Sequence, residues 1–225
     1  SEIARLKSVQ EIYRKRSEHT KKIDRFWHIV LSQHPEFSEY IRSSDFKYLE
    51  LIKDIYVTWD VSQPESESSN PGDFSITFEF NALGDDFPAQ IIVKNDDEDN
   101  ADDTERLVSE NADIVWPESY DSINPVKIQD KKTPEGKKNY RTGMKSFFGW
   151  FKWTGRKPAK EFPNGEDFAR LFSEDIFPYA VKYYTEAQRD GLEEEDDSDA
   201  SEPLDLSDND DDSRGTKRKH EEDEE

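Results

Sequence analysis

Acidic side chains at close spacing dominate the last 35 residues of the chain. Residues 191–225 contain 17 Asp or Glu against four Lys or Arg, and so carry more than half of the formal net charge of -22. The run Glu193-Glu194-Glu195-Asp196-Asp197 repels itself and has almost nothing apolar to bury, so we expect a disordered, solvated tail. Its chemistry is electrostatic, because a polyanion attracts cationic protein and repels nucleic acid. The alternative is a tail that serves solubility alone.

Side chains that could support catalysis or metal binding are scattered. The chain has no Cys, and its four His residues, at positions 19, 28, 34 and 220, lack the spacing of a zinc site. Residues 95–100 are acidic, but no frame supplies both the Gly and the Glu of a calcium loop. No nucleophile stands beside a base, and no glycine-rich loop would hold a phosphate. The sequence therefore predicts no enzyme activity, no metal and no cofactor.

Two basic clusters interrupt the acidic pattern. The first lies within 131–145, follows no nucleic-acid-binding motif and is interpreted as a solvated loop. A nucleic-acid-binding protein that uses this cluster is an alternative hypothesis. The second cluster, Lys217-Arg218-Lys219, lies in the acidic tail and has the composition of a nuclear import signal.

The elements that position these residues begin with a predicted helix from Ile3 to Leu31, a segment without Pro or Gly. At about 1.5 Å per residue it would exceed about 40 Å, so we expect it to pair with another helix. Because the chain begins without Met and already in helical register, we expect this helix, within residues 1–34, to be N-terminally truncated. The positions assigned to its buried face, in a dimer or under the sheet, are Leu6, Val9, Ile12, His19, Ile23, Phe26 and Val30.

A change to period-two alternation predicts four antiparallel strands in a meander within a single domain, residues 35–190. The alternating residues are Ile55, Val57 and Trp59, then the run from Phe74 to Phe80, then Ile91 and Val93, then Ile114 and Trp116. We expect the acidic insertion 95–104 to be a mobile loop and helices at 166–172 and 173–189 to close the domain. An aromatic block is assigned to the core: Phe147, Phe148, Trp150 and Phe151.

Four segments, in this order and followed by an acidic tail, resemble the nucleosome assembly protein family. They are Phe26 to Pro35, Asp73 to Phe80, Ser146 to Phe151 and Glu174 to Tyr184, and the SET-type branch is the most similar. Within that branch, further segments resemble the fungal SET-type histone chaperones that partner a histone H3 lysine acetyltransferase: Ser43 to Tyr48, Tyr120 to Pro125, Pro134 to Lys138 and Glu186 to Asp190.

The resemblance implies an α+β fold. A long N-terminal helix dimerises antiparallel with its twin, and an "earmuff" domain holds a four-stranded antiparallel sheet backed by helices. It also implies a non-enzymatic nuclear protein that binds core histones and assists nucleosome assembly. The H3-H4 pair is the favoured partner, with the other core-histone pair as an alternative, and DNA is contacted only indirectly. A role as cofactor of a histone acetyltransferase rests on the branch resemblance.

In the family, the histone-facing surface lies partly on the last helices. Carried over by motif, the candidates are Glu174, Asp175, Glu186 and Asp190, together with the run Glu193, Glu194, Glu195, Asp196 and Asp197. Glu174 and Asp175 follow Ser173 at a predicted helix start, where the helix dipole stabilises carboxylates by about 0.3–1 kcal/mol without any partner. A purely structural role is therefore one alternative. Another is an acidic regulator that docks on an enzyme, with histone binding incidental.

Overall fold

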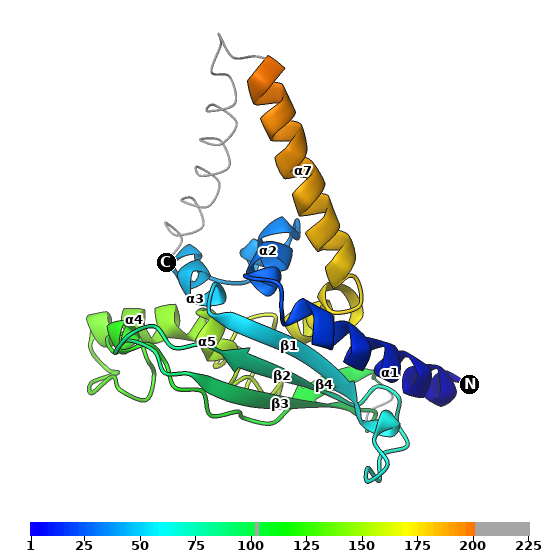
Figure 1. Cartoon of the computed structure of the whole chain (residues 1–225). Helices are drawn as coiled ribbons and strands as arrows, with labels where there is room; N and C mark the ends of the chain where they lie inside the picture. Colours follow the sequence, from blue (N-terminus) through cyan, green and yellow to red (C-terminus); the bar gives the residue numbers. More distant parts are fainter. Residues whose placement is uncertain (102–103, 201–225) are drawn as a thin grey trace.

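A four-stranded antiparallel sheet forms the centre of the molecule (Figure 1). The computed structural model describes residues 1–101 and 104–200, with side chains to Glu194. The strands form a meander in the order β1 (Ile52–Trp59), β2 (Phe74–Phe80), β3 (Gln90–Asp99) and β4 (Arg106–Ser109). The predicted fold class, an α+β domain with a four-stranded antiparallel sheet backed by helices, is confirmed.

The inner face of the sheet is built from aromatic side chains. Along β2, every second residue from Phe74 to Phe80 is buried, as period-two alternation requires. The Phe78 ring packs edge-on against the rings of Trp150 and Phe172, at centroid distances of 5.9 and 5.4 Å. The aromatic block assigned to the core is confirmed there, with no solvent exposure at Phe147, Phe148, Trp150 and Phe151.

The position of the fourth strand was predicted wrongly. Ile114 and Trp116 are buried but lie in an irregular segment, and β4 forms earlier. The acidic insertion 95–104 is also not wholly a loop, because β3 continues to Asp99. Ion pairs explain how acidic residues enter a strand, since Asp96 lies 3.3 Å from Lys94 Nζ and Asp99 lies 3.2 Å from the Arg106 guanidinium.

Helices cover the inner face and one edge of the sheet. The α-helices of the described residues are α1 (Glu2–Thr20), α2 (Phe26–Gln33), α3 (Phe46–Leu49), α4 (Pro134–Met144), α5 (Phe147–Trp150), α6 (Gly165–Leu171) and α7 (Ala180–Ala200). Short 3₁₀ turns occupy Phe37–Glu39, Ser43–Asp45, Asp60–Ser62 and Glu118–Tyr120, and a π-helical turn occupies Phe172–Ile176. None of the helices described is long and apolar enough to cross a membrane.

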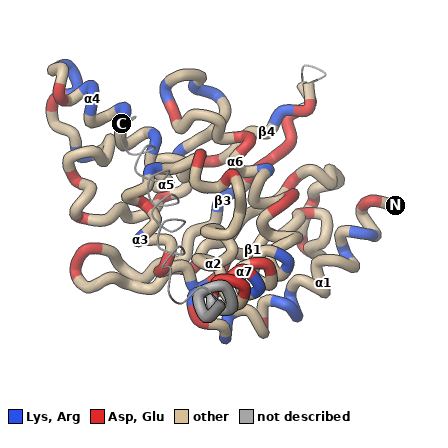
Figure 2. Tube along the Cα trace, turned by 90° about the horizontal axis from the view of Figure 1, so that it is seen from above, with Lys and Arg blue, Asp and Glu red and all other residues tan. Residues whose placement is uncertain are grey.

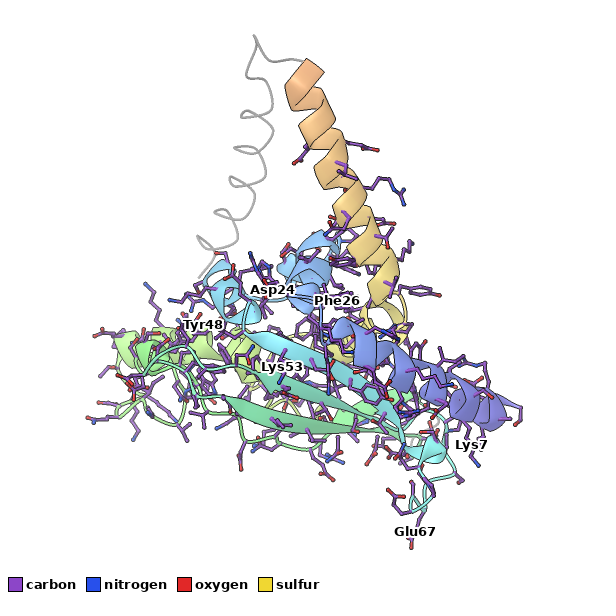
Figure 3. All side chains as sticks on the ribbon, in the orientation of Figure 1. Lys7, Asp24, Phe26, Tyr48, Lys53 and Glu67 are labelled. Carbon is purple, nitrogen blue, oxygen red and sulfur yellow. The ribbon has the colours of Figure 1, made fainter. Side chains whose placement is uncertain are left out.

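The single helix predicted from Ile3 to Leu31 is wrong, because α1 ends at Thr20 and α2 begins at Phe26. Between them Arg25 takes a left-handed conformation, with φ of 57°, which costs about 1–2 kcal/mol. Burial of Phe26 and Trp27, at 3% and 1% exposure, together outweighs this cost, since full burial of each such side chain contributes about 1.5–3 kcal/mol. Figure 3 shows Phe26 directed into the body, whereas Lys7 and Glu67 lie at the periphery.

Helix α1 covers the outer edge of the sheet. The Gln10 side chain donates to the Val57 carbonyl at 3.0 Å and accepts from the Trp59 N–H at 2.9 Å. These contacts satisfy backbone groups of the edge strand β1 that have no neighbouring strand on that side. At about 1.5 Å per residue, the 19 residues of α1 span about 28 Å, well short of the length expected for the continuous helix.

Helix α7 projects away from the body of the molecule (Figure 1). Its base packs on α2, where the Phe26 and Tyr184 rings stack at 5.1 Å. Pro178 lies between the π-helical turn and α7, so the helix predicted at 173–189 begins later, at Ala180. Residues 191–200, predicted as the first part of a disordered tail, instead belong to α7. Residues 201–225 lie outside the described part of the chain.

Candidate functional site

The acidic residues singled out in the sequence lie on a helical turn and on the helix that follows it. Helix α6 runs without a break into the π-helical turn Phe172–Ile176, in which Phe172 and Ile176 are completely buried. Burial of these two apolar side chains directs Glu174 outward and leaves Asp175 part-exposed. Pro178 has no N–H to continue the hydrogen-bond ladder, so the chain restarts as α7.

Asp175 is held by the fold. One carboxylate oxygen accepts a hydrogen bond of 2.6 Å from the Tyr183 hydroxyl, and the other lies 2.9 Å from His34 Nε2. His34 Nδ1 accepts the backbone N–H groups of Glu36 and Phe37 at 3.1 and 3.2 Å, so the ring is neutral and Nε2 donates to Asp175. Burial, followed by the bond to Asp175, raises the pKa of Tyr183. Asp175 therefore fastens α2 to α7.

Glu174 is free to meet a partner, since its side chain is 65% exposed. Its one ion pair among the described residues is a long contact of 3.4 Å to Arg170, one helical turn earlier. Arg170 also pairs with Glu166 at 3.2 Å, so its charge is shared between two carboxylates. Glu174 thus keeps most of its negative charge available to an incoming cation.

Glu174 also lines a groove of about 580 Å³ between α1, the end of the sheet and the start of α7. Apolar side chains line part of it: Leu6, Val9, Tyr13, Trp59, Phe74 and Pro178. Charged side chains line the rest: Glu2, Glu98, Glu105 and Glu174, together with Arg5 and Arg170. Such a groove suits a segment that presents both a cation and an apolar side chain.

Helix α7 itself is strongly acidic. It contains eight Asp or Glu and two Lys or Arg, and most of the acidic residues fall in its last two-thirds. Asp190 accepts a hydrogen bond of 2.9 Å from the Gln33 amide, Glu186 is half-buried, and Glu193 and Glu194 are exposed. Glu195, Asp196 and Asp197 continue the helix, but their side chains lie outside the described part. Figure 2 shows acidic residues along α7 seen end-on.

The placement of these charges matters energetically. The carbonyl end of a helix carries partial negative charge, so carboxylates near it are repelled by the helix dipole as well as by one another. The last turns of α7 therefore gain stability from a cationic partner. This half of the helix therefore presents an anionic surface.

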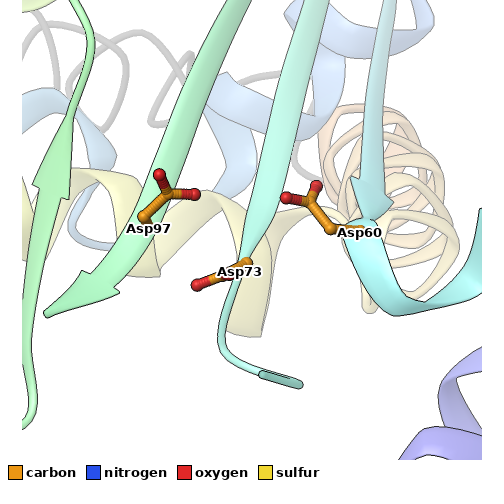
Figure 4. Close-up of side chains that lie close together, drawn as sticks. All are labelled: Asp60, Asp73 and Asp97. Atoms are coloured by element: carbon orange, nitrogen blue, oxygen red, sulfur yellow. The ribbon is translucent and has the colours of Figure 1, made fainter. Parts of the chain in front are cut away.

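A second acidic cluster consists of Asp60, just after β1, Asp73, just before β2, and Asp97 in β3 (Figure 4). Carboxylate oxygens of the three residues lie within 4.8 Å of one another, and no other such group is found in the described residues. Burial, reinforced by the neighbouring charge of Asp73, raises the pKa of Asp60 and of Asp97. Asp73 accepts the Glu98 N–H at 2.9 Å and the Ser68 hydroxyl at 2.8 Å. The cluster concentrates negative charge at this end of the sheet.

A family model for nucleosome assembly protein (NAP) matches residues 2–187 of the chain. The chain belongs to the nucleosome assembly protein family. The match includes α1, the whole sheet and the base of α7, so it covers the groove and Glu186, whereas the acidic residues from Asp190 onward lie beyond it.

Relatives within the family support this assignment. Vacuolar protein sorting-associated protein 75 of Saccharomyces cerevisiae is 50% identical over 217 residues, which cover 93% of this chain and 80% of that protein. Protein SET of Drosophila melanogaster is 27% identical over 181 residues, which cover 76% of this chain and 59% of that protein. The crystal structure of the Vps75 histone chaperone matches with a TM-score of 0.79 and 51% identity, covering 84% of this chain and 88% of that one.

The residues assigned to a dimerisation face do not form one stripe in this NAP-family protein. Leu6, Phe26 and Val30 are buried in the protomer, and Val9 is half-buried beside the groove. Ile12 and Ile23 are 62% and 37% exposed, and His19 is exposed. The break between α1 and α2 separates the set. On the outer face of α1, Ile12 remains exposed and could contact a second copy.

The residues predicted as a nuclear import signal, Lys217, Arg218 and Lys219, lie outside the described residues.

Sequence analysis missed the groove, the Asp60, Asp73 and Asp97 cluster and the bond between His34 and Asp175. Each of these features brings together residues that are far apart in the chain, and a local sequence pattern cannot indicate such a contact. One further feature did leave a signal. Lys94 and Asp96 stand at inward positions of the alternating segment that starts at Ile92, where charged residues are unusual, and both prove completely buried.

Proposed function

We propose that the protein is a histone chaperone, which binds core histones through the acidic face of α7 and the adjoining groove and assists nucleosome assembly. The observation that carries this proposal is the acidic α7, whose charges serve a cationic partner better than they serve the fold. The similarity to Vps75, whose crystal structure is described as that of a histone chaperone, supports it. The proposed mechanism is binding and release, without catalysis.

The physical requirement is to shield a very basic, partly apolar protein from DNA without holding it irreversibly. Many weak, screened contacts along α7 give fast exchange and a strong dependence on salt. The groove adds the apolar contact that a polyanion lacks, with Glu174 at its rim to fix the cation. Residues after Ala200 would extend the anionic surface and raise the local concentration of acidic groups.

The favoured cargo is the H3-H4 pair, with the other core-histone pair as the alternative. We further propose that the protein works as a homodimer in which the outer face of α1, with Ile12, meets a second copy, and that it acts in the nucleus. Because Ser43 to Tyr48 and Tyr120 to Pro125 resemble segments of the fungal SET-type chaperones, we also propose a role as cofactor of a histone H3 lysine acetyltransferase. Co-purification of such an enzyme would support that role, and an unchanged acetylation rate would contradict it.

A nucleosome assembly reaction tests the main proposal. With relaxed closed-circular DNA and purified core histones at physiological salt, the full chain should increase supercoiling and prevent aggregation of histones on DNA. The Glu174→Lys variant should assemble less, and Asp85→Lys should behave like the unmodified protein, because Asp85 is exposed in the turn at the far end of β2 from the groove. If Glu174→Lys assembles nucleosomes at the normal rate, Glu174 is not part of the histone-binding surface. If the full chain itself does not increase supercoiling, an acidic regulator of an enzyme fits the protein better than a chaperone.

A further inference from the structure

An exposed basic surface stands in contrast to the rest of this acidic protein. Residues 127–160 contain 11 Lys or Arg and two Asp or Glu, in a chain whose formal net charge is -22. Six of these side chains, all exposed, lie on or beside α4 and define the α4 basic surface: Lys131, Lys132, Lys137, Lys138, Arg141 and Lys145. Figure 2 shows basic residues along α4, well separated from the acidic α7.

The cations of the α4 basic surface are not neutralised by salt bridges, although Asp130 and Glu135 lie nearby in the chain. Among the side chains that the structure describes, none of the six cations forms an ion pair, and Lys131 Nζ makes a cation–π contact with the Tyr140 ring at 5.2 Å. Arg141 follows Lys137 by four residues and Lys138 by three, so like charges face each other on one side of the helix. Each such pair destabilises a helix by about 0.2–0.5 kcal/mol. An anion bound across the surface would relieve this repulsion.

The chain carries a suitable anion of its own. Residues 201–225 contain 11 Asp or Glu and four Lys or Arg, and they follow directly on α7. At about 3.3–3.6 Å per residue, these 25 residues can extend about 80–90 Å. Helix α7 is only about 31 Å long at about 1.5 Å per residue, so the segment can return along it and reach the body of the molecule.

We propose that residues 201–225 dock on the α4 basic surface and cover it when no basic partner is bound. The tether gives the segment an effective concentration in the millimolar range, so even a weak, screened interaction is largely formed at low salt. Docking keeps nucleic acid from α4 and ends when a more basic protein takes the segment. The inference concerns the free protein and does not depend on which basic partner the protein carries.

A spin label tests the docking directly. Because the chain has no Cys, Ser213→Cys gives the full chain a single attachment point within the segment. With a nitroxide on residue 213, amide NMR signals of α4 should broaden at low salt and recover at high salt. The Lys137→Glu/Lys138→Glu/Arg141→Glu variant should lose the broadening. The control Lys7→Glu/Lys15→Glu, which changes exposed lysines of α1, should keep it. Broadening that is absent, or that survives the α4 changes, would overturn the proposal.

Lysine modification gives an independent measurement. The comparison protein is a full-length variant in which the 11 Asp and Glu of 201–225 are changed to Asn and Gln. A small acetylating reagent should modify Lys137 and Lys138 about tenfold more slowly in the unmodified chain than in this variant, because the docked segment covers them. The exposed Lys7 and Lys15 provide the internal reference for reagent reactivity. If Lys137 and Lys138 react equally fast in both proteins, the segment does not cover α4.

Discussion

His34 and Asp175 are joined by a hydrogen bond of 2.9 Å between Nε2 and the carboxylate, which ties the end of α2 to the turn that precedes α7. Both ring nitrogens of His34 are engaged, and the His34 side chain is only 2% exposed. The adjacent Glu174 is largely exposed and paired only weakly. Asp175 therefore stabilises the fold, whereas the neighbouring carboxylate of Glu174 remains exposed on the surface.

Replacement of His34 separates these roles. His34→Ala should lower the free energy of unfolding by about 1–3 kcal/mol, because Asp175 loses a donor and the backbone N–H groups of Glu36 and Phe37, the second of them buried, lose their acceptor. Glu174→Lys should change it by less than about 0.5 kcal/mol, as an exposed substitution does. Urea unfolding of both variants measures this. Equal destabilisation by the two changes would place Glu174 in the fold as well.

The buried pair of Lys94 and Asp96 predicts a large effect of a single substitution. The Lys94 ammonium lies 3.3 Å from the Asp96 carboxylate and 4.9 Å from the ring centroids of Trp150 and Trp153, with both charged side chains completely buried. Lys94→Met should destabilise the protein by about 3–5 kcal/mol at pH 7, since Asp96 is left as an unpaired buried anion. The double variant Lys94→Met/Asp96→Asn should recover much of this loss. A double variant that is no more stable than the single one would contradict this account.

The same pair predicts a dependence on pH. Burial raises the pKa of Asp96 from 3.8 to about 6, so the folded protein binds this proton more tightly than the unfolded chain does. The stabilising contribution is complete below about pH 4 and is lost as the pH rises through about 6. As the pH rises from 4 to 7, the free energy of unfolding of Asp96→Asn should therefore increase relative to that of the unmodified protein. Denaturation at both pH values tests this, and a constant difference between the proteins would count against it.

Mutual repulsion within the Asp60, Asp73 and Asp97 cluster is also open to test. Burial and the charge of Asp73 raise the pKa of Asp97, so its ionised form costs stability once the pH exceeds that pKa. Asp97→Asn should raise the free energy of unfolding at pH 7 by less than about 1 kcal/mol, because the side chain is largely solvated. The gain should fall at pH 3.5, where the carboxylate is protonated. Thermal unfolding at the two pH values is sufficient, and a loss of stability at pH 7 would refute the repulsion.

Helix α1 offers a test of the proposed dimer. Ile12 is 62% exposed in the protomer, so Ile12→Asp should leave the protomer folded but weaken self-association if α1 meets a second copy. Leu6 is 2% exposed, and Leu6→Asp should instead destabilise the protomer by several kcal/mol. Sedimentation velocity and circular dichroism distinguish the two effects. An Ile12→Asp protein that remains fully dimeric would place the interface elsewhere.

Much of the fold could be predicted from local patterns. The alternation of Phe74, Ile76, Phe78 and Phe80 has one physical solution, a strand with one buried face, and the structure has it. The break at Arg25 could not be predicted, because residues on both sides of it suit a helix. Only the burial of Phe26 and Trp27 against other parts of the chain favours the left-handed turn.

The candidate site was predictable in composition but not in arrangement. The acidity of Glu186 to Asp197 is a property of the sequence, whereas the extension of α7 to Ala200 depends on helix continuation through Gly191, a residue that favours termination. The groove beside Glu174 forms only when α1, β1 and the π-helical turn pack together, and the sequence of any one of these segments does not indicate that packing. The fourth strand was misplaced for a similar reason, since ion pairs with Lys94 and Arg106 make acidic residues acceptable in β3.

The central claim is that the acidic α7 surface of the folded domain binds histones, and direct titration tests it most sharply. Purified H3-H4 would be titrated by calorimetry at two salt concentrations into the full chain, into Glu174→Lys/Glu186→Lys/Glu193→Lys and into the control Asp85→Lys. We predict that affinity falls with salt for the unmodified chain and the control, and that the triple variant binds at least tenfold more weakly at the lower salt. Unchanged affinity in the triple variant would contradict the claim and leave the residues after Ala200 as a nonspecific polyanion.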